Sequence, residues 1–507
     1  MRLDRPLLAL SLLLASQAQA AITPDQAKTL ETQLQTWFNT NFGKIAKPGT
    51  RAFQVTPSGD RYEIAIPTGL RREGSSDPLT VTMLASPPAN GRWVFDQLKI
   101  PQPFEYSITM TPPKEPGQKD TPAPVTMRSK VTARLQDGSG VWDPTFATPS
   151  SIKQRMEGLN SQATGNGVTQ TTMVESSTTE IVMTPVGTDK VNVVSTATLS
   201  GYSLKMDGGD APMLQATAKT GQVSFNLTGA SRERGTEAIA AMVDLVAAGI
   251  PGITPVKPGA ATAAEPKLSP AGMAALKRIV ATLPDLGSAM AIDESVTGLA
   301  ITSAGKSFGA AKAGLTMNMK SVSGQVQAVL GVVAEGMAWP DLGMGTMEQL
   351  LPKRLVLRPT LAGVSGQDLA DVLNGAVESG QTGKPSAAET AARTRLLSRG
   401  ATIGLEAMEF DTGGSTFSAT GSLVLQGGPG GQPVPRTGKA HVVARDFDKL
   451  VTVISTEPML AQAMPALVFL KGLGKSAEGG LVWDVTFDGG KLAVNGTDMS
   501  AMMGGAR

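Results

Sequence analysis

Apolar and polar residues alternate through most of residues 51–206, which indicates β-strands. Clusters of Pro, Gly and Asn separate the runs, as at Pro57-Ser58-Gly59 and Asn90-Gly91. A period of two with one apolar face predicts antiparallel strands that are buried on one side only. We expect loops at residues 111–124 and 161–167. The runs include Phe53/Val55, Tyr62/Ile64/Ile66, Val81/Met83, Trp93/Phe95/Leu98 and Tyr106/Ile108/Met110.

A helix is predicted ahead of these strands. Thr23 can cap it, Pro24 suits its first position, and Gly43 and Pro48 end it. The side chains at helical spacing on one face are Leu30, Leu34, Trp37, Phe38 and Phe42. We interpret this face as packing on the following sheet, the alternative being a helix that binds a partner or a membrane.

The second half carries a pattern that occurs three times: a strand, two helices, then a strand hairpin. The copies cover residues 221–330, 354–430 and 439–497, and a linker rich in Ala, Pro and Gly lies at 254–267 in the first. Chance agreement of elements is the alternative to a true repeat. We therefore predict a β-rich α+β fold of antiparallel sheets with helix pairs, with residues 21–210 forming the N-terminal helix and a β-rich region.

Residues 1–20 have the features of a secretory signal peptide. Arg2 and Arg5 precede an apolar run at 7–15, and Ala18-Gln19-Ala20 predicts cleavage between Ala20 and Ala21. A buried helix or a retained anchor is the alternative. The later sequence contains no candidate transmembrane segment, so we expect an exported protein in the periplasm.

Composition narrows the classes of function. The chain has no Cys, which excludes thiol catalysis, Cys-ligated zinc and iron–sulfur clusters. The chain has a formal net charge of +2 and no cluster of basic residues. We therefore expect no nucleic-acid partner. We predict no cofactor and no metal site.

Two short motifs resemble catalytic loops. Asp411-Thr412-Gly413-Gly414-Ser415 is similar to an aspartic-protease loop, but that chemistry needs a second carboxylate and no second such motif occurs. Residues 300–307 fit a relaxed phosphate-loop pattern, although its middle residues include no Gly and strand-like alternation follows. We interpret the first as a hairpin turn and expect no nucleotide-binding site at the second.

Other candidate groups are isolated. His441 is the single histidine and lies in a predicted strand, where a role as catalytic base is the alternative to a surface position. Asp207-Gly208-Gly209-Asp210 lacks the ligand spacing of a calcium loop, so we predict a solvated turn. Methionines are interpreted as core filler or, alternatively, as the lining of a groove for an acyl chain: Met317, Met319, Met344, Met347, Met408, Met499, Met502 and Met503.

The C-terminal segment carries a family resemblance. A strand at 481–487 is followed by the turn Asp488-Gly489-Gly490, a short strand, and Asn495-Gly496. With the helix that begins Asp446-Phe447-Asp448, this segment resembles the proteobacterial family called domain of unknown function 2125. The resemblance implies an envelope location and a β-rich fold, and no catalytic residues.

Three hypotheses of function remain. The first is a non-enzymatic periplasmic protein that binds a partner or an apolar, lipid-like envelope component. The second is a structural or surface assembly protein. The third is a hydrolase whose carboxylates or hydroxyls meet only in the fold.

Overall fold

The computed structural model describes residues 22–42, 49–71, 78–110, 125–144, 148–165, 167–208, 211–247, 269–282, 287–382, 387–428, 432–457 and 460–500. These residues divide into two compact units. Unit 1 comprises residues 1–166 with 176–183, and unit 2 comprises 167–175 with 184–507. The predicted signal, its cleavage point at Ala20 and Ala21, the 111–124 loop and the 254–267 linker lie outside the described residues.

The described residues of unit 1 form an antiparallel sheet with one helix, α2 (Pro24–Phe42). Its strands are hydrogen-bonded in the order β1-β2-β3-β4-β7-β8-β6-β5. They are β1 (Gln54–Ser58), β2 (Arg61–Arg71), β3 (Pro78–Ala85), β4 (Trp93–Lys99), β5 (Phe104–Met110), β6 (Val125–Thr132), β7 (Leu135–Asp143) and β8 (Thr148–Gly165).

The core of unit 1 joins α2 to the sheet. Leu30 and Leu34 are buried with Tyr62 and Trp93 in one apolar cluster, which confirms the predicted packing of the helix. Thr23 caps α2, because its Oγ1 accepts the Gln26 N–H at 3.2 Å. The prediction of a loop at 161–167 is wrong for its first five residues. They continue strand β8, which pairs with β6.

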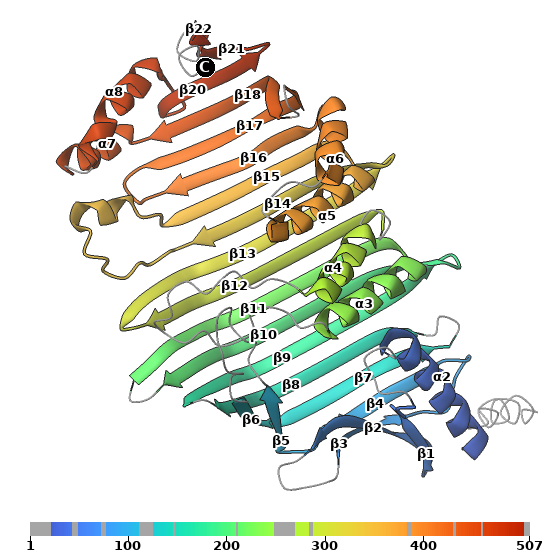
Figure 1. The fold of residues 1–507 in the computed structure, drawn as a ribbon. Coiled ribbons are helices and arrows are strands. Elements are labelled where there is room, and N and C mark those ends of the chain that lie inside the picture. The colour runs from blue at the N-terminus through green and yellow to red at the C-terminus, as the bar shows by residue number, and fades with distance from the viewer. Residues whose placement is uncertain are drawn as a thin grey trace, which may run out of the picture. The chain divides into compact units, whose positions relative to one another are not determined.

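Unit 2 is a series of antiparallel strands in which neighbours in the chain are neighbours in the sheet (Figure 1). From β10 to β18 each strand pairs with the next, and β20 follows β18. The strands are β10 (Lys190–Gly208), β11 (Ala211–Ser231), β12 (Ala289–Ser303), β13 (Lys306–Val322), β14 (Gln325–Glu335), β15 (Arg354–Ser365), β16 (Thr402–Asp411), β17 (Thr416–Gly427), β18 (Pro433–Arg445), β19 (Lys475–Ala477), β20 (Gly480–Asp488), β21 (Lys491–Val494) and β22 (Thr497–Asp498). Strand β9 (Val168–Val186) is divided between the units.

The helices of unit 2 interrupt this series in pairs. The order strand, two helices, strands occurs three times: β11-α3-α4-β12, β15-α5-α6-β16 and β18-α7-α8-β19. The fold is therefore β-rich α+β, as predicted. The helices are α3 (Arg232–Ala247), α4 (Pro270–Thr282), α5 (Gly366–Thr382), α6 (Ala387–Ser398), α7 (Phe447–Thr456) and α8 (Met464–Leu473), with short 3-10 turns η2 (Gly345–Leu350) and η4 (Ala461–Ala463).

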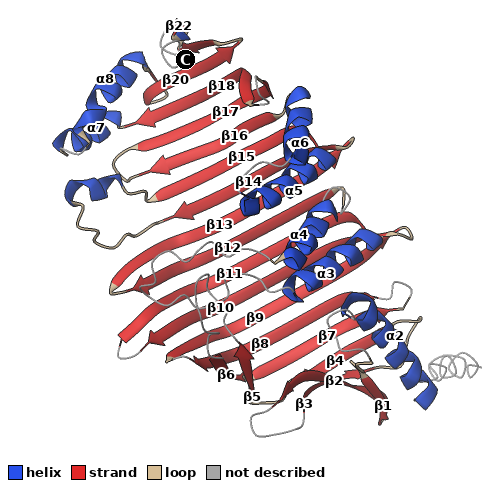
Figure 2. Ribbon diagram, viewed as in Figure 1, coloured by secondary structure: helices blue, strands red, loops and turns tan. Residues whose placement is uncertain are grey.

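The helix pairs lie at opposite ends of the strands. Figure 2 shows α3 to α6 over one sheet face near one end of the strands, and α7 and α8 beside the other end of β18. Among the described residues, no helix combines the length and apolarity that a membrane crossing requires.

Candidate functional site: an apolar sheet face

The strand register of unit 2 gathers apolar side chains on one face. Residues paired across antiparallel strands point to the same side of the sheet, and alternate residues point to opposite sides. One cross-strand row therefore joins residues of β11 to β16: Val223, Glu294, Leu315, Val332, Leu357 and Met408. The next rows add Phe225, Ile292, Met317, Leu330, Pro359 and Leu405, then Leu227, Met290, Met319, Ala328, Leu361 and Ile403. We call this side the apolar face.

The opposite side of the same sheet is more polar, although Val333 and Val356 also lie on it. Its rows include Gln222 and Ser295, whose strand neighbours Val223 and Glu294 belong to the apolar face. Thr220 and Thr297 share a hydroxyl hydrogen bond of 2.6 Å on this side, and Arg354 pairs with both Glu335 and Glu409. Charged and hydroxyl side chains are therefore concentrated on this side, opposite the apolar face.

Helices cover the apolar face only at its margins. Near α3 to α6, the strand-end residues Val326, Val364 and Ala401 are almost fully buried. At the other margin, side chains of α7 and α8 pack on Ala444 and Trp483 in a separate core cluster. The central part of the face has no such cover among the described residues.

Large apolar side chains are consequently exposed in the centre. We define the open strip by five residues on β11, β13, β14, β15 and β16: Val223 (41% exposed), Leu315 (39%), Leu330 (40%), Leu357 (36%) and Ile403 (46%). Five strand intervals of about 4.8 Å give the strip a length of about 24 Å.

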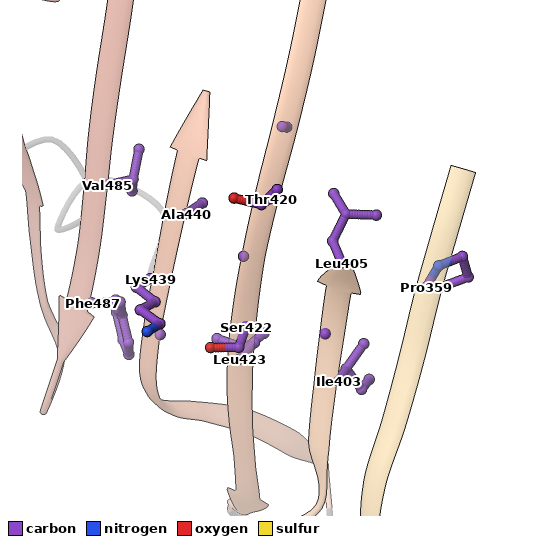
Figure 3. A pocket seen from close by; sticks show the side chains of 14 residues that line it. Pro359, Ile403, Leu405, Thr420, Ser422, Leu423, Lys439, Ala440, Val485 and Phe487 are labelled. Atoms are coloured by element: carbon purple, nitrogen blue, oxygen red, sulfur yellow. The ribbon is translucent and has the colours of Figure 1, made fainter. Parts of the chain in front are cut away.

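A cavity of about 430 Å³ continues the apolar face toward β20. Figure 3 shows its lining, which includes Ile403, Leu405, Leu423 and Phe487. Glycines deepen it, because a Cβ at Gly438 would lie 2.8 Å from the Leu423 Cδ1. The volume is within the range of small-molecule sites.

The chemistry of this site is that of hydrocarbon contact. The described residues that line the cavity include one charged residue, Lys439, and no carboxylate or imidazole. Glu294, which is exposed, is the charged side chain in the three rows described above. Met317, Met319 and Met408 lie on the apolar face, whereas Met344 is exposed elsewhere and Met502 and Met503 lie outside the described residues.

The two catalytic look-alikes are hairpin turns, as predicted for the first of them. Residues 411–415 join β16 to β17, with the Thr412 N–H donating to the Ser415 carbonyl and Gly413 at φ +80°. Residues 300–307 join β12 to β13 through Ala304 (φ +49°) and Gly305 (φ +75°). A phosphate loop needs a following helix, so the strand that begins at Lys306 excludes that interpretation.

The remaining candidates are dispersed. His441 lies on β18, on the polar side, with its Nδ1 2.7 Å from the Asp484 Oδ1. Asp207 and Gly208 end β10, whereas Gly209 and Asp210 lie outside the described residues. Within the described part of the chain, no group of three or more acidic or histidine side chains is placed to hold a metal ion.

Sequence reasoning identified most of these strands but missed β14 and the open strip. The sequence does contain a pattern that indicates this strip, since Leu315/Met317/Met319 and Leu355/Leu357 alternate with polar residues. Comparison with known proteins adds no further assignment, because no family model, curated protein or solved structure matches this chain.

Proposed function

We propose that this protein binds the acyl chain of an envelope lipid along the open strip, without catalysing a reaction. The observation that carries the proposal is the set of half-exposed Val, Leu and Ile side chains on one sheet face, which Glu294 interrupts at β12. Exposed apolar surface of this kind is characteristic of interaction sites.

Hydrogen bonding favours hydrocarbon as the occupant. The backbone N–H and C=O groups of central strands are hydrogen-bonded to neighbouring strands. They are therefore not available to a ligand on this face. An occupant with polar groups of its own would leave them unsatisfied against Leu315, Leu330 and Leu357. An alkyl chain loses no hydrogen bond there and gains about 0.8 kcal/mol per buried methylene group.

The dimensions of the site agree with such a ligand. Half of the roughly 30 Å hydrocarbon core of a bilayer is about 15 Å, which approximates the reach of one membrane acyl chain. The open strip, at about 24 Å, is longer. The predicted signal peptide and the family resemblance support a location in the cell envelope, where such lipids occur.

A titration with a fluorescent long-chain fatty acid tests the proposal. Leu357 and Arg358 are adjacent, exposed and on opposite faces of β15, so they form a matched pair. We expect Leu357→Gln to weaken binding about tenfold. Arg358→Gln should leave the affinity unchanged.

Two outcomes would contradict the proposal. One is the absence of saturable binding, together with no lipid in native mass spectra of protein purified from the envelope. The other is a dimer that Leu357→Gln dissociates while lipid is absent, which would instead support the assembly hypothesis, because an exposed apolar face also suits a second copy of the chain.

A further inference from the structure

Two cross-strand rows of the apolar face continue beyond β16 into the cavity. One row runs from Ile403 on β16 to Phe487 on β20, and the next runs from Leu405 to Val485. Residues that are paired in this way point to the same side of the sheet. The floor of the cavity is therefore a part of the apolar face, and the cavity adjoins the open strip.

Small residues form the middle of this floor. Gly421, Gly438 and Ala440 lie on β17 and β18, between the larger side chains of β16 and those of β20 (Figure 3). A Cβ at Gly421 would lie 2.7 Å from the Lys439 carbonyl oxygen. The missing side chain at this position thus follows from the close approach of two strand backbones, which makes the hollow a fixed feature of the sheet.

The open strip has room for one acyl chain without the cavity. From Leu315 on β13 to Ile403 on β16 there are three strand intervals, or about 14 Å. This length is close to the roughly 15 Å that one membrane acyl chain reaches. In the row of Leu315, Glu294 interrupts the apolar side chains at β12. A chain that lies between β13 and β16 therefore ends at Ile403.

The cavity offers a second stretch of similar length. From β16 through β17 and β18 to β20 there are again three strand intervals, or about 14 Å. Ile403 is 46% exposed and belongs to both stretches, whereas Leu423 and Phe487 are half-buried walls of the second. The apolar face thus has two consecutive places, each as long as one acyl chain.

The chemistry of the second place also suits hydrocarbon. Lys439 lies between Gly438 and Ala440 on β18, so side-chain alternation puts it on the opposite side of the sheet. Strands β17 and β18 each pair with a strand on both sides, which occupies their backbone groups. A polar ligand would lose hydrogen bonds to water over this floor, and an alkyl chain would lose none.

We propose that the cavity binds a second acyl chain, separate from the chain on the open strip, so that one protein molecule holds two chains end to end. This inference rests on the proposed function, because it extends the same apolar face. It adds a binding stoichiometry and a subsite with its own residues.

Native mass spectrometry of the delipidated protein with added palmitic acid counts the bound chains. We expect two at saturation. Ala440→Leu places a larger side chain beside Gly421 and should leave one bound chain, with the affinity of the open strip unchanged. Thr486→Leu is the matched control, because Thr486 is exposed on the opposite side of β20 from Val485 and Phe487. This variant should still bind two chains.

A second variant changes the cavity in the opposite steric sense. Phe487→Ser removes one wall and should weaken binding of the second chain about tenfold, while the first chain keeps its affinity. Leu357→Gln should have the converse effect, because Leu357 belongs to the open strip and does not line the cavity.

The outcomes separate this inference from the proposed function. A single bound chain that Leu357→Gln weakens and Ala440→Leu does not would overturn the second subsite and leave the open strip intact. Two bound chains that neither Ala440→Leu nor Phe487→Ser affects would also overturn it, since the second chain would then lie elsewhere. No bound chain at all would contradict the open strip itself, and the second subsite would fall with it.

Discussion

His441 shows how one residue on the polar side couples two strands. It lies directly opposite Asp484 in the β18–β20 pairing, and its Nε2 is 3.4 Å from the Glu478 Oε1. The hydrogen bond to Asp484 raises the pKa of His441 above its usual 6.5, and the nearby negative charges of Glu478 and Asp484 add to this effect. The imidazole is part-exposed, as in a surface ion pair.

The pH dependence of this contact has a definite sign. Because the folded-state pKa is raised, the stabilisation by His441 is fully present below about pH 6.5 and is lost as pH rises through the folded-state value. As His441 is the single histidine, its imidazole NMR signals report the titration without ambiguity. We expect Asp484→Asn to lower the measured pKa; an unchanged pKa would show that the contact is absent in solution.

At the scale of elements, the start of α5 is held by a buried carboxylate. The Ser365 hydroxyl accepts the Asp368 N–H at 3.0 Å, and Arg395 and Arg399 of the α6 region donate to the two Asp368 oxygens at 2.9 and 2.6 Å. Burial by itself raises the pKa of Asp368. The hydrogen bonds from Ser365 and Arg395 and the charge of Arg399 outweigh burial and hold that pKa below its ordinary 3.8.

Removing this charge should loosen the α5–α6 pair. Asp368→Asn is expected to lower the free energy of unfolding by about 1–3 kcal/mol, less than a fully buried pair would give because Arg395 is half exposed. The stabilisation exists above about pH 3.8 and disappears as pH falls through the lowered value. Urea unfolding measures it. Asp371→Asn is the control, with an expected cost below about 0.5 kcal/mol because Asp371 is more exposed.

At the scale of the whole molecule, the two units have separate cores. The cluster around Tyr62 belongs to unit 1, whereas the apolar face and the cluster around Phe447 belong to unit 2. A ligand that binds one folded unit stabilises that unit by mass action. Ligand binding to the open strip should therefore stabilise unit 2 and leave the stability of unit 1 unchanged.

Pulse proteolysis with peptide mass spectrometry can resolve this selectivity. A long-chain fatty acid at about 100 times its dissociation constant should raise the free energy of unfolding of unit 2 by about 2.7 kcal/mol. Peptides of β11 to β17 should then resist cleavage at higher urea, while those of β1 to β4 should not change. An equal shift in both sets, or a shift of undiminished size in Leu357→Gln, would contradict ligand binding at the open strip.

Much of the fold follows from local sequence. Period-two runs such as Leu315/Met317/Met319 predicted strands, and the Thr23 and Ser365 caps predicted helix starts. The turn at Gly413 was also predicted, and the turn at Gly305 has the same cause, since each requires a left-handed backbone that glycine tolerates. The prediction of a loop at 161–167 was wrong because Ser, Gln and Thr, which occur in that run, also occur on the solvent-exposed face of a strand.

By itself, the sequence determined which residues of each strand share a face, because side-chain alternation is a local property of extended backbone. Only the tertiary structure decided that Val223, Leu315 and Leu357 lie in one row, since register depends on pairings between residues far apart in the chain. It also decided where helices leave that face uncovered and that Ile403 stays exposed. Burial is a property of packing between elements, and no single segment encodes it.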